Sequence, residues 1–272
     1  MKNPYVRVIT INIIQIFILG LMFVLGFDQY IQSTNLYIFG IAGIGGSVIC
    51  LSSTLLFYKF VDKQPLYTLG FGFKRKHVLF SLSSILSTVG MYLLYYMALS
   101  KNGIVTAQFS GDYFSNAHVI PMFIITALAW FLVGLNEEVA YRGYFVANFK
   151  HLSTGKLFFI SSVLFTASHV YKGFSIPFIF VLVSSGMTML YIYLKSGSLL
   201  AASFPHFIYD FLDNQLLGNS DISILQIDGR PSDIHFFILH LLFIVIHIIL
   251  VRVFFRQRIN VRLEKLNEPI QS

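Results

Sequence analysis

Six long stretches of the chain contain no Asp, Glu, Lys or Arg and are apolar along most of their length. A helix needs roughly 20 apolar residues to cross a bilayer core of about 30 Å, and these stretches meet that length or come close to it. Two further apolar stretches carry ionisable side chains within them. The eight predicted spans are Val8–Phe27, Leu36–Tyr58, Val78–Ser100, Val119–Asn136, Leu157–Tyr171, Gly173–Leu194, Ser196–Leu217 and Ile234–Val251. The chain is therefore predicted to be all-α, a polytopic membrane helix bundle of about eight transmembrane helices, with residues 1–272 forming a single integral membrane domain.

The composition agrees with a lipid bilayer as the surroundings. Hydrophobic residues make up 56% of the chain and charged residues only 11%, whereas about a quarter of a soluble domain is charged. The net charge of +7 is carried by bases scattered over short loops, a pattern typical of loops that stay on the cytoplasmic side of a membrane. We therefore expect no nucleic-acid partner. A single cysteine, Cys50, excludes an intramolecular disulfide.

The basic residues also predict the orientation. Lys2 and Arg7 precede the first span, which lacks a small-residue cleavage site after it, so we expect an uncleaved anchor rather than a signal peptide. If eight helices alternate, most bases fall on one side: Lys2, Arg7, Lys59, Lys63, Lys74, Arg75, Lys76, Lys150, Lys156, Lys195, Arg252, Arg256, Arg258, Arg262 and Lys265. Bases concentrate on the cytoplasmic side, so both termini are predicted to be cytoplasmic.

Two features need only a packing explanation. The second span contains glycines suited to close helix approach, namely Gly40, Gly43, Gly45 and Gly46. His240 and His247 lie seven residues apart on one face of the last span. Without a third ligand, we expect them to be packed or interfacial rather than bound to metal.

Three polar clusters interrupt the apolar stretches, at residues 136–142, 165–169 and 206–210. Counted from the expected cytoplasmic turns, Glu137 and His169 each lie 13 residues away, and His206 and Asp210 lie 10 and 14 residues away. At 1.5 Å per residue these side chains are all roughly 15–21 Å from that end. Ionisable groups inside a membrane are costly, so their common depth predicts one shared functional site.

Spacing within the clusters supports that prediction. Glu138 and Arg142 are four residues apart on one helix face and can form an ion pair, and His206 and Asp210 have the same spacing. Glu137 points about 100° away from Glu138, so it can face a cavity while Arg142 neutralises its neighbour. We expect Glu137 to act as a general base.

The ordered motifs resemble those of the CAAX-protease and bacteriocin-processing family of intramembrane proteases, the Abi group. They stand here as Glu137-Glu138-x-x-x-Arg142, Phe165-x-x-x-His169 and His206-x-x-x-Asp210, within about residues 118–217. The resemblance implies a glutamate-dependent peptidase whose cavity opens to the cytoplasm.

The resemblance also implies roles for the residues. Glu137, helped by His169, would activate water, and His206 with the residue at 210 would stabilise the oxyanion, while Glu138 and Arg142 would hold the helix. An ionised Asp210 cannot donate a hydrogen bond, so it is either protonated or orients a charged His206; we favour the second.

Zinc is the alternative cofactor, because two histidines and a carboxylate can supply three ligands. No His-Glu-x-x-His spacing is present, so a mechanism without cofactor is favoured.

The leading hypothesis is a bacterial membrane endopeptidase acting on a peptide or a membrane-protein tail. A composition poor in Ala and rich in Ile, Phe, Lys and Asn indicates a bacterium with an AT-rich genome, in which prenylated substrates are not expected. By family analogy alone, the substrate is a bacteriocin or pheromone precursor or a regulatory membrane protein. The rival hypotheses are a non-catalytic partner (an immunity factor or a scaffold for a membrane sensor kinase) and a proton-coupled transporter, although the two halves show no internal repeat.

Overall fold

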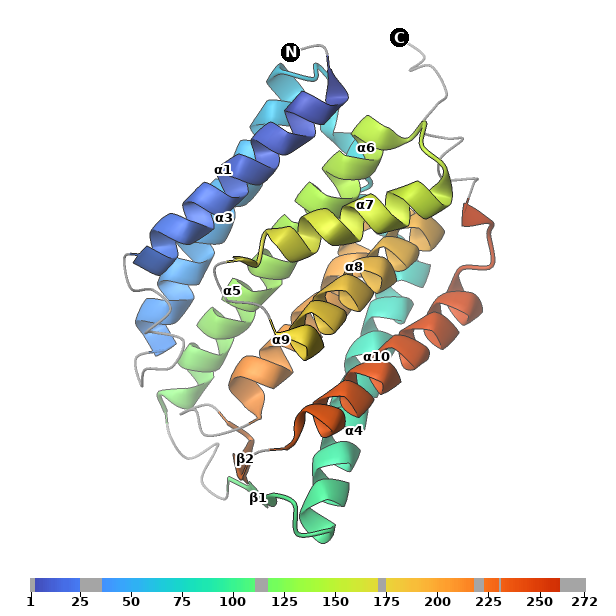
Figure 1. Cartoon of the computed structure of the whole chain (residues 1–272). Coiled ribbons are helices and arrows are strands. Elements are labelled where there is room, and N and C mark those ends of the chain that lie inside the picture. Colours follow the sequence, from blue (N-terminus) through green and yellow to red (C-terminus); the bar gives the residue numbers. More distant parts are fainter. Residues whose placement is uncertain are drawn as a thin grey trace.

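The computed structural model describes residues 3–24, 36–110, 117–170, 175–217, 223–229 and 231–259. Over these residues the chain forms a bundle of helices with a small two-stranded ribbon at one end (Figure 1). The helices are α1 (Pro4–Val24), α3 (Leu36–Phe60), α4 (Arg75–Lys101), α5 (Val119–Glu138), α6 (Phe145–Phe149), α7 (Thr154–Ala167), α8 (Ile176–Ser196), α9 (Leu199–Phe211) and α10 (Asp233–Phe254). The prediction of an all-α polytopic bundle is confirmed.

Six helical segments among the described residues are long and apolar enough to cross a membrane. They are Pro4–Met22, Gly40–Phe60, Arg75–Lys101, Val119–Phe149, Ile176–Ser196 and Asp233–Phe254, and each overlaps one of the six charge-free stretches of the sequence. The fourth runs on from α5 through a π-helical turn, η2 (Val139–Tyr144), into α6. The helix therefore continues past its polar cluster almost to Lys150, the length on which the depth estimate relied.

The other two predicted spans are shorter than expected. Helix α7 has 14 residues, about 21 Å, and ends at Ala167, before His169. Helix α9 has 13 residues and is extended by a second π-helical turn, η4 (Leu212–Leu216). Most of α9 is buried within the protein and not exposed on its surface.

The ribbon was not predicted. Strand β1 (Thr106–Phe109) follows α4, and it pairs antiparallel with β2 (Leu225–Asp228), with Thr106 opposite Asp228 and Phe109 opposite Leu225. Alternation within β2 explains its formation, because Leu225 and Ile227 are buried while the residues between and after them are exposed.

Close contact between α3 and α5 depends on glycine, as the sequence predicts. A Cβ atom on Gly40 would overlap Ile125, and one on Gly43 would lie 3.2 Å from the Cβ of Ala129. Small residues on α3 thus bring the helix that carries Glu137 close to its neighbour.

The two histidines of α10 are packed, as expected. His240 contacts the Ser184 hydroxyl at 2.9 Å and the Tyr209 hydroxyl at 3.2 Å. His247 contacts the Ser84 hydroxyl at 2.7 Å and the Phe243 carbonyl oxygen at 2.8 Å. Both ring nitrogens of each histidine therefore have protein partners.

Candidate active site

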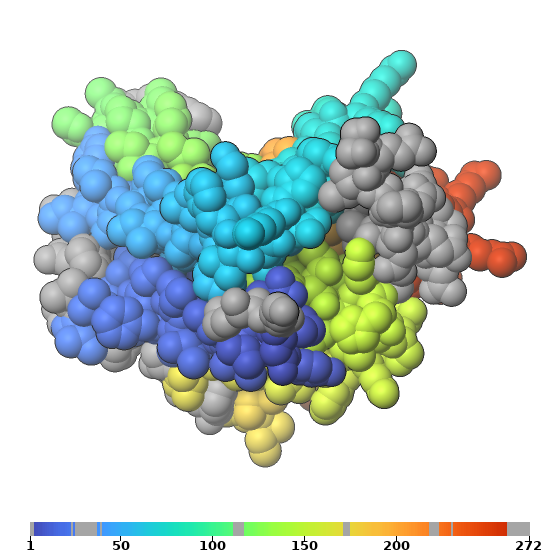
Figure 2. Space-filling model, turned by 90° about the horizontal axis from the view of Figure 1, so that it is seen from above, coloured from blue at the N-terminus to red at the C-terminus, as the bar shows by residue number. Residues whose placement is uncertain are grey.

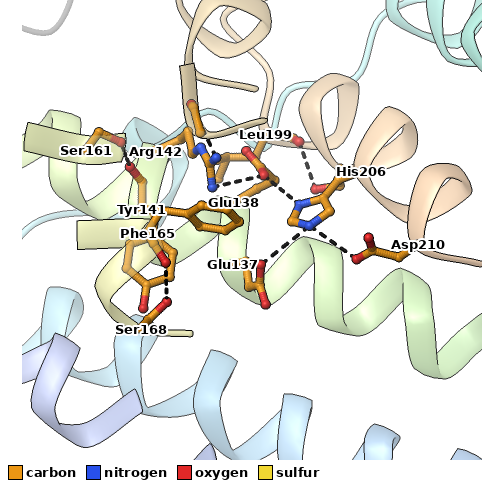
Figure 3. A network of polar contacts seen from close by, with 12 residues as sticks. Glu137, Glu138, Tyr141, Arg142, Ser161, Phe165, Ser168, Leu199, His206 and Asp210 are labelled. Atoms are coloured by element: carbon orange, nitrogen blue, oxygen red, sulfur yellow. Dashed lines mark hydrogen bonds and ion pairs between the residues drawn. The ribbon is translucent and has the colours of Figure 1, made fainter. Parts of the chain in front are cut away.

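The three polar clusters come together in one network of polar contacts (Figure 3). Glu137 lies in the last turn of α5, His169 follows the end of α7, and His206 and Asp210 lie one turn apart on α9. These side chains can meet only if their three helices also lie side by side. The equal membrane depth estimated from the sequence did not determine that arrangement.

His206 is the centre of the cluster. Its Nδ1 lies 2.9 Å from Oε1 of Glu138, and its Nε2 lies 3.3 Å from Oδ2 of Asp210 and 3.4 Å from Oε2 of Glu137. One imidazole therefore faces carboxylate oxygens with both nitrogens. Each of these contacts can be a hydrogen bond only where the facing nitrogen or the carboxyl group carries a proton.

Glu138 and Arg142 form an internal ion pair. The Arg142 Nη1 lies 3.2 Å from Oε1 of Glu138, and both residues are 0% exposed. The guanidinium carbon of Arg142 also lies 4.5 Å from the ring centroid of Phe165, a cation–π contact, and its Nη2 donates to the carbonyl oxygen of Gly186 at 3.4 Å. The planar group of Arg142 thus ties α5 to α7 and α8.

The orientation of His169 follows from its hydrogen bond. Its Nδ1 lies 2.9 Å from the carbonyl oxygen of Phe165, which can only accept, so Nδ1 carries the proton. The Nε2 faces Oε1 of Glu137 at 3.9 Å. That distance is too long for a direct hydrogen bond, but a water molecule can contact both groups.

The predicted difference between the two glutamates is present. Glu137, His169, His206 and Asp210 line a cavity of about 280 Å³, whereas Glu138 and Arg142 do not. Most of the wall is apolar or aromatic and comes from six helices: Leu19 and Met22 of α1, Ala42 and Gly43 of α3, Trp130 and Val133 of α5, Phe165 of α7, Phe178, Val181 and Leu182 of α8, and Phe236 and Phe243 of α10. These walls could not be assigned from the sequence, because the rotation of each helix was unknown.

A polar clamp beside Glu137 was also missed. Asn136 donates to Oε1 of Gln15 at 3.1 Å, and Gln15 donates back to Oδ1 of Asn136 at 3.3 Å. Gln15 also donates to the carbonyl oxygen of Cys50 and to the Thr54 hydroxyl, both at 3.0 Å. One amide of α1 therefore joins α3 and α5 next to Glu137. A lone Gln in the middle of an apolar span was the available signal.

Among the described residues, no group of three His, Cys, Asp or Glu side chains has the arrangement of a metal site. His206 already directs both nitrogens at protein carboxylates, which competes with its use as a ligand. The described side chains therefore do not fit a bound zinc ion.

Comparison with known proteins bears on the same part of the chain. Residues 119–212 match the family model described as type II CAAX prenyl endopeptidase Rce1-like. No curated protein and no solved structure matches the chain. The matched segment contains all six candidate residues, so the resemblance inferred from the motifs is confirmed, and it supports a CAAX-type intramembrane protease in general terms.

Proposed function

We propose that the chain is an intramembrane endopeptidase in which Glu137 activates a water molecule for attack on a peptide bond. The observation that carries this proposal is the placement of one carboxylate and two imidazoles around a common space at the cavity wall. Glu137 lies 3.9 Å from His169 and 3.4 Å from His206. Hydrolysis needs a base beside the reacting water and a hydrogen-bond donor beside the substrate carbonyl, and these three side chains can supply both.

In the first step a water molecule lies between Glu137 and His169. The Glu137 carboxylate takes a proton from the water, and the water oxygen forms a bond to the scissile carbonyl carbon. His169 orients the water through Nε2, since its Nδ1 proton is engaged by the carbonyl of Phe165.

In the second step the negative charge on the former carbonyl oxygen is stabilised by His206. Its Nε2 lies at the cavity wall, where the substrate oxygen can replace one of its carboxylate contacts. Asp210 contacts the same nitrogen at 3.3 Å and orients the imidazole, so we assign to it the second of the two roles considered above. Collapse of the intermediate breaks the C–N bond, and Glu137 returns the proton to the leaving amine.

Glu138 and Arg142 act through the other residues. Glu138 accepts from Nδ1 of His206 while its charge is balanced by Arg142, so the pair fixes the position of the imidazole. Both are positioning residues in this mechanism, because neither lines the cavity.

The test compares purified wild type and Glu137→Gln for cleavage of a mixed quenched-peptide library in detergent, with a chelator present. Glu137→Gln retains shape and removes the base. Asp228→Asn on β2 is the matched control, since it makes the same chemical change outside the cavity. Cleavage by wild type and by Asp228→Asn, but not by Glu137→Gln, supports the proposal and speaks against zinc.

Equal cleavage by all three proteins would contradict it. Activity that appears only when the chelator is replaced by zinc would overturn the metal-free mechanism. A cellular function that survives Glu137→Gln would instead favour the non-catalytic partner, whether immunity factor or sensor-kinase scaffold.

A further inference from the structure

We infer that the cavity takes its substrate from the face of the bundle that carries the β1–β2 ribbon, and that this face is extracytoplasmic. The substrate is accordingly a polypeptide segment with apolar side chains exposed outside the cytoplasm. The position of the opening stands by itself, whereas the statement about substrate rests on the proposed peptidase function. An opening on the extracytoplasmic face is the opposite of the cytoplasmic opening that the family resemblance implies.

The first observation is the part of each helix that lines the cavity. Helix α1 contributes Leu19 and Met22, close to its end, and α10 contributes Phe236 and Phe243 from its first half. Helix α8 contributes residues that begin at Phe178, close to its start, and end at Met189. In Figure 1 the end of α1 and the starts of α8 and α10 all point toward the end of the bundle where β1 and β2 lie. The cavity therefore occupies the ribbon half of the molecule.

The second observation is that the opposite side of the site is filled. Glu138 and Arg142 follow Glu137 toward α6, and Leu199 and Ala202 precede His206 on α9. All four residues are completely buried. In the described part of the chain, this packing separates the cavity from the end at which α1 begins and α10 ends. Figure 2 views that end, where the segment linking α3 to α4 lies across the middle.

The third observation is a gradient of exposure along one face of α9 and η4. Ser203 is completely buried and His206 is 8% exposed, while the Asp210 side chain is 25% exposed. Farther along, Asp213 is half-buried and Asn214 is exposed, and both line the cavity. The polar stripe thus leads from the buried site to solvent in the direction of the ribbon, which is also a route for the water that hydrolysis consumes.

The basic residues decide which side of the membrane this is. In the described chain, Lys59, Lys74, Lys156, Lys195 and Arg252 all lie at helix ends remote from the ribbon. Lys101 is at the ribbon end, with Asp228 and Asp233 nearby. Bases gather on the cytoplasmic side, so the ribbon and the cavity opening face outward.

The test introduces a single thiol into the full chain in a Cys50→Ser background and labels intact cells with a membrane-impermeant maleimide. Asn214→Cys probes the opening, and Lys156→Cys, at an exposed position at the start of α7, is the matched control. Denatured samples give the total thiol. We expect Asn214→Cys to be labelled in intact cells and Lys156→Cys only after permeabilisation. The reverse pattern, or protection of Asn214→Cys under both conditions, overturns the inference.

Labelling requires no catalysis, so it separates this inference from the proposed function. A membrane-impermeant quenched peptide added to intact cells then tests the substrate statement. Cleavage by wild-type cells and not by Glu137→Gln cells is expected. Cleavage in detergent but not by intact wild-type cells would overturn entry from outside. External labelling of Asn214→Cys without cleavage in either setting would refute the peptidase and leave the outward opening supported.

Discussion

Glu137 and Glu138 are adjacent in the chain, yet their carboxylates occupy opposite environments. Glu137 lines a cavity beside two imidazoles, and Glu138 is fully buried against Arg142. The 100° rotation between neighbouring helical residues separates a group that can meet water from one that cannot. The same substitution at the two positions should therefore have different consequences.

Glu137→Gln should abolish turnover with little effect on the fold. Loss of a general base typically lowers the rate by roughly 10²–10⁴, whereas the Gln side chain keeps the shape of Glu137 and can still lie beside Nε2 of His206. The measurement pairs cleavage rate with thermal unfolding in detergent. A variant that loses activity and unfolds at a much lower temperature would indicate a structural role instead.

Glu138→Gln should destabilise the protein, because it leaves the charge of Arg142 buried without its partner. Breaking a buried ion pair on one side costs about 3–5 kcal/mol, and removing both charges costs less. The double variant Glu138→Gln with Arg142→Gln should consequently unfold at a higher temperature than Glu138→Gln alone. If the effects of the two single substitutions simply add, the pair is not coupled as the 3.2 Å contact indicates.

The sequence predicted this local arrangement because helical spacing alone determines it. The pair Glu138–Arg142 and the contact of His206 with Asp210 follow from separations of four residues. The equal depth of three clusters predicted their convergence, although the actual contacts between Glu137, His169 and His206 depend on how three helices rotate and tilt.

Other features had no comparable local signal. The π-helical turn at Val139–Tyr144 adds a residue to one turn directly after Glu138, and such turns are frequent at functional sites. The pairing of β1 with β2 joins segments more than 100 residues apart. The direction of the opening depends on side-chain burial around His206, for which the sequence carries no signal.

The amide pair of Gln15 and Asn136 leads to a third prediction. Gln15→Leu should lower kcat more than it raises KM, because Asn136 adjoins Glu137 and its hydrogen bonds to α1 fix the end of α5. Asn12→Leu is a suitable control, since the Asn12 side chain donates to the Val8 carbonyl on its own helix. The measurement is the steady-state kcat and KM of both variants. Equal losses for the two would mean that a buried amide in α1 supports the fold and not the position of Glu137.

The charge of the cavity leads to the last prediction, which concerns the end of the substrate. Among its described lining residues are the carboxylates of Glu137, Asp210 and Asp213, with no Lys or Arg. A free C-terminal carboxylate three residues beyond the scissile bond would lie roughly 10 Å from such groups, and like charges at that distance repel by about 1.7 kcal/mol at an effective dielectric constant near 20. Two peptides that differ only in amidation of the C-terminus should therefore differ by roughly 15- to 20-fold in kcat/KM, the amide being preferred. High salt should narrow the difference, because screening weakens the repulsion. A preference for the free carboxylate would contradict this repulsion and would indicate that an imidazole of the cavity, such as His206, receives the chain end.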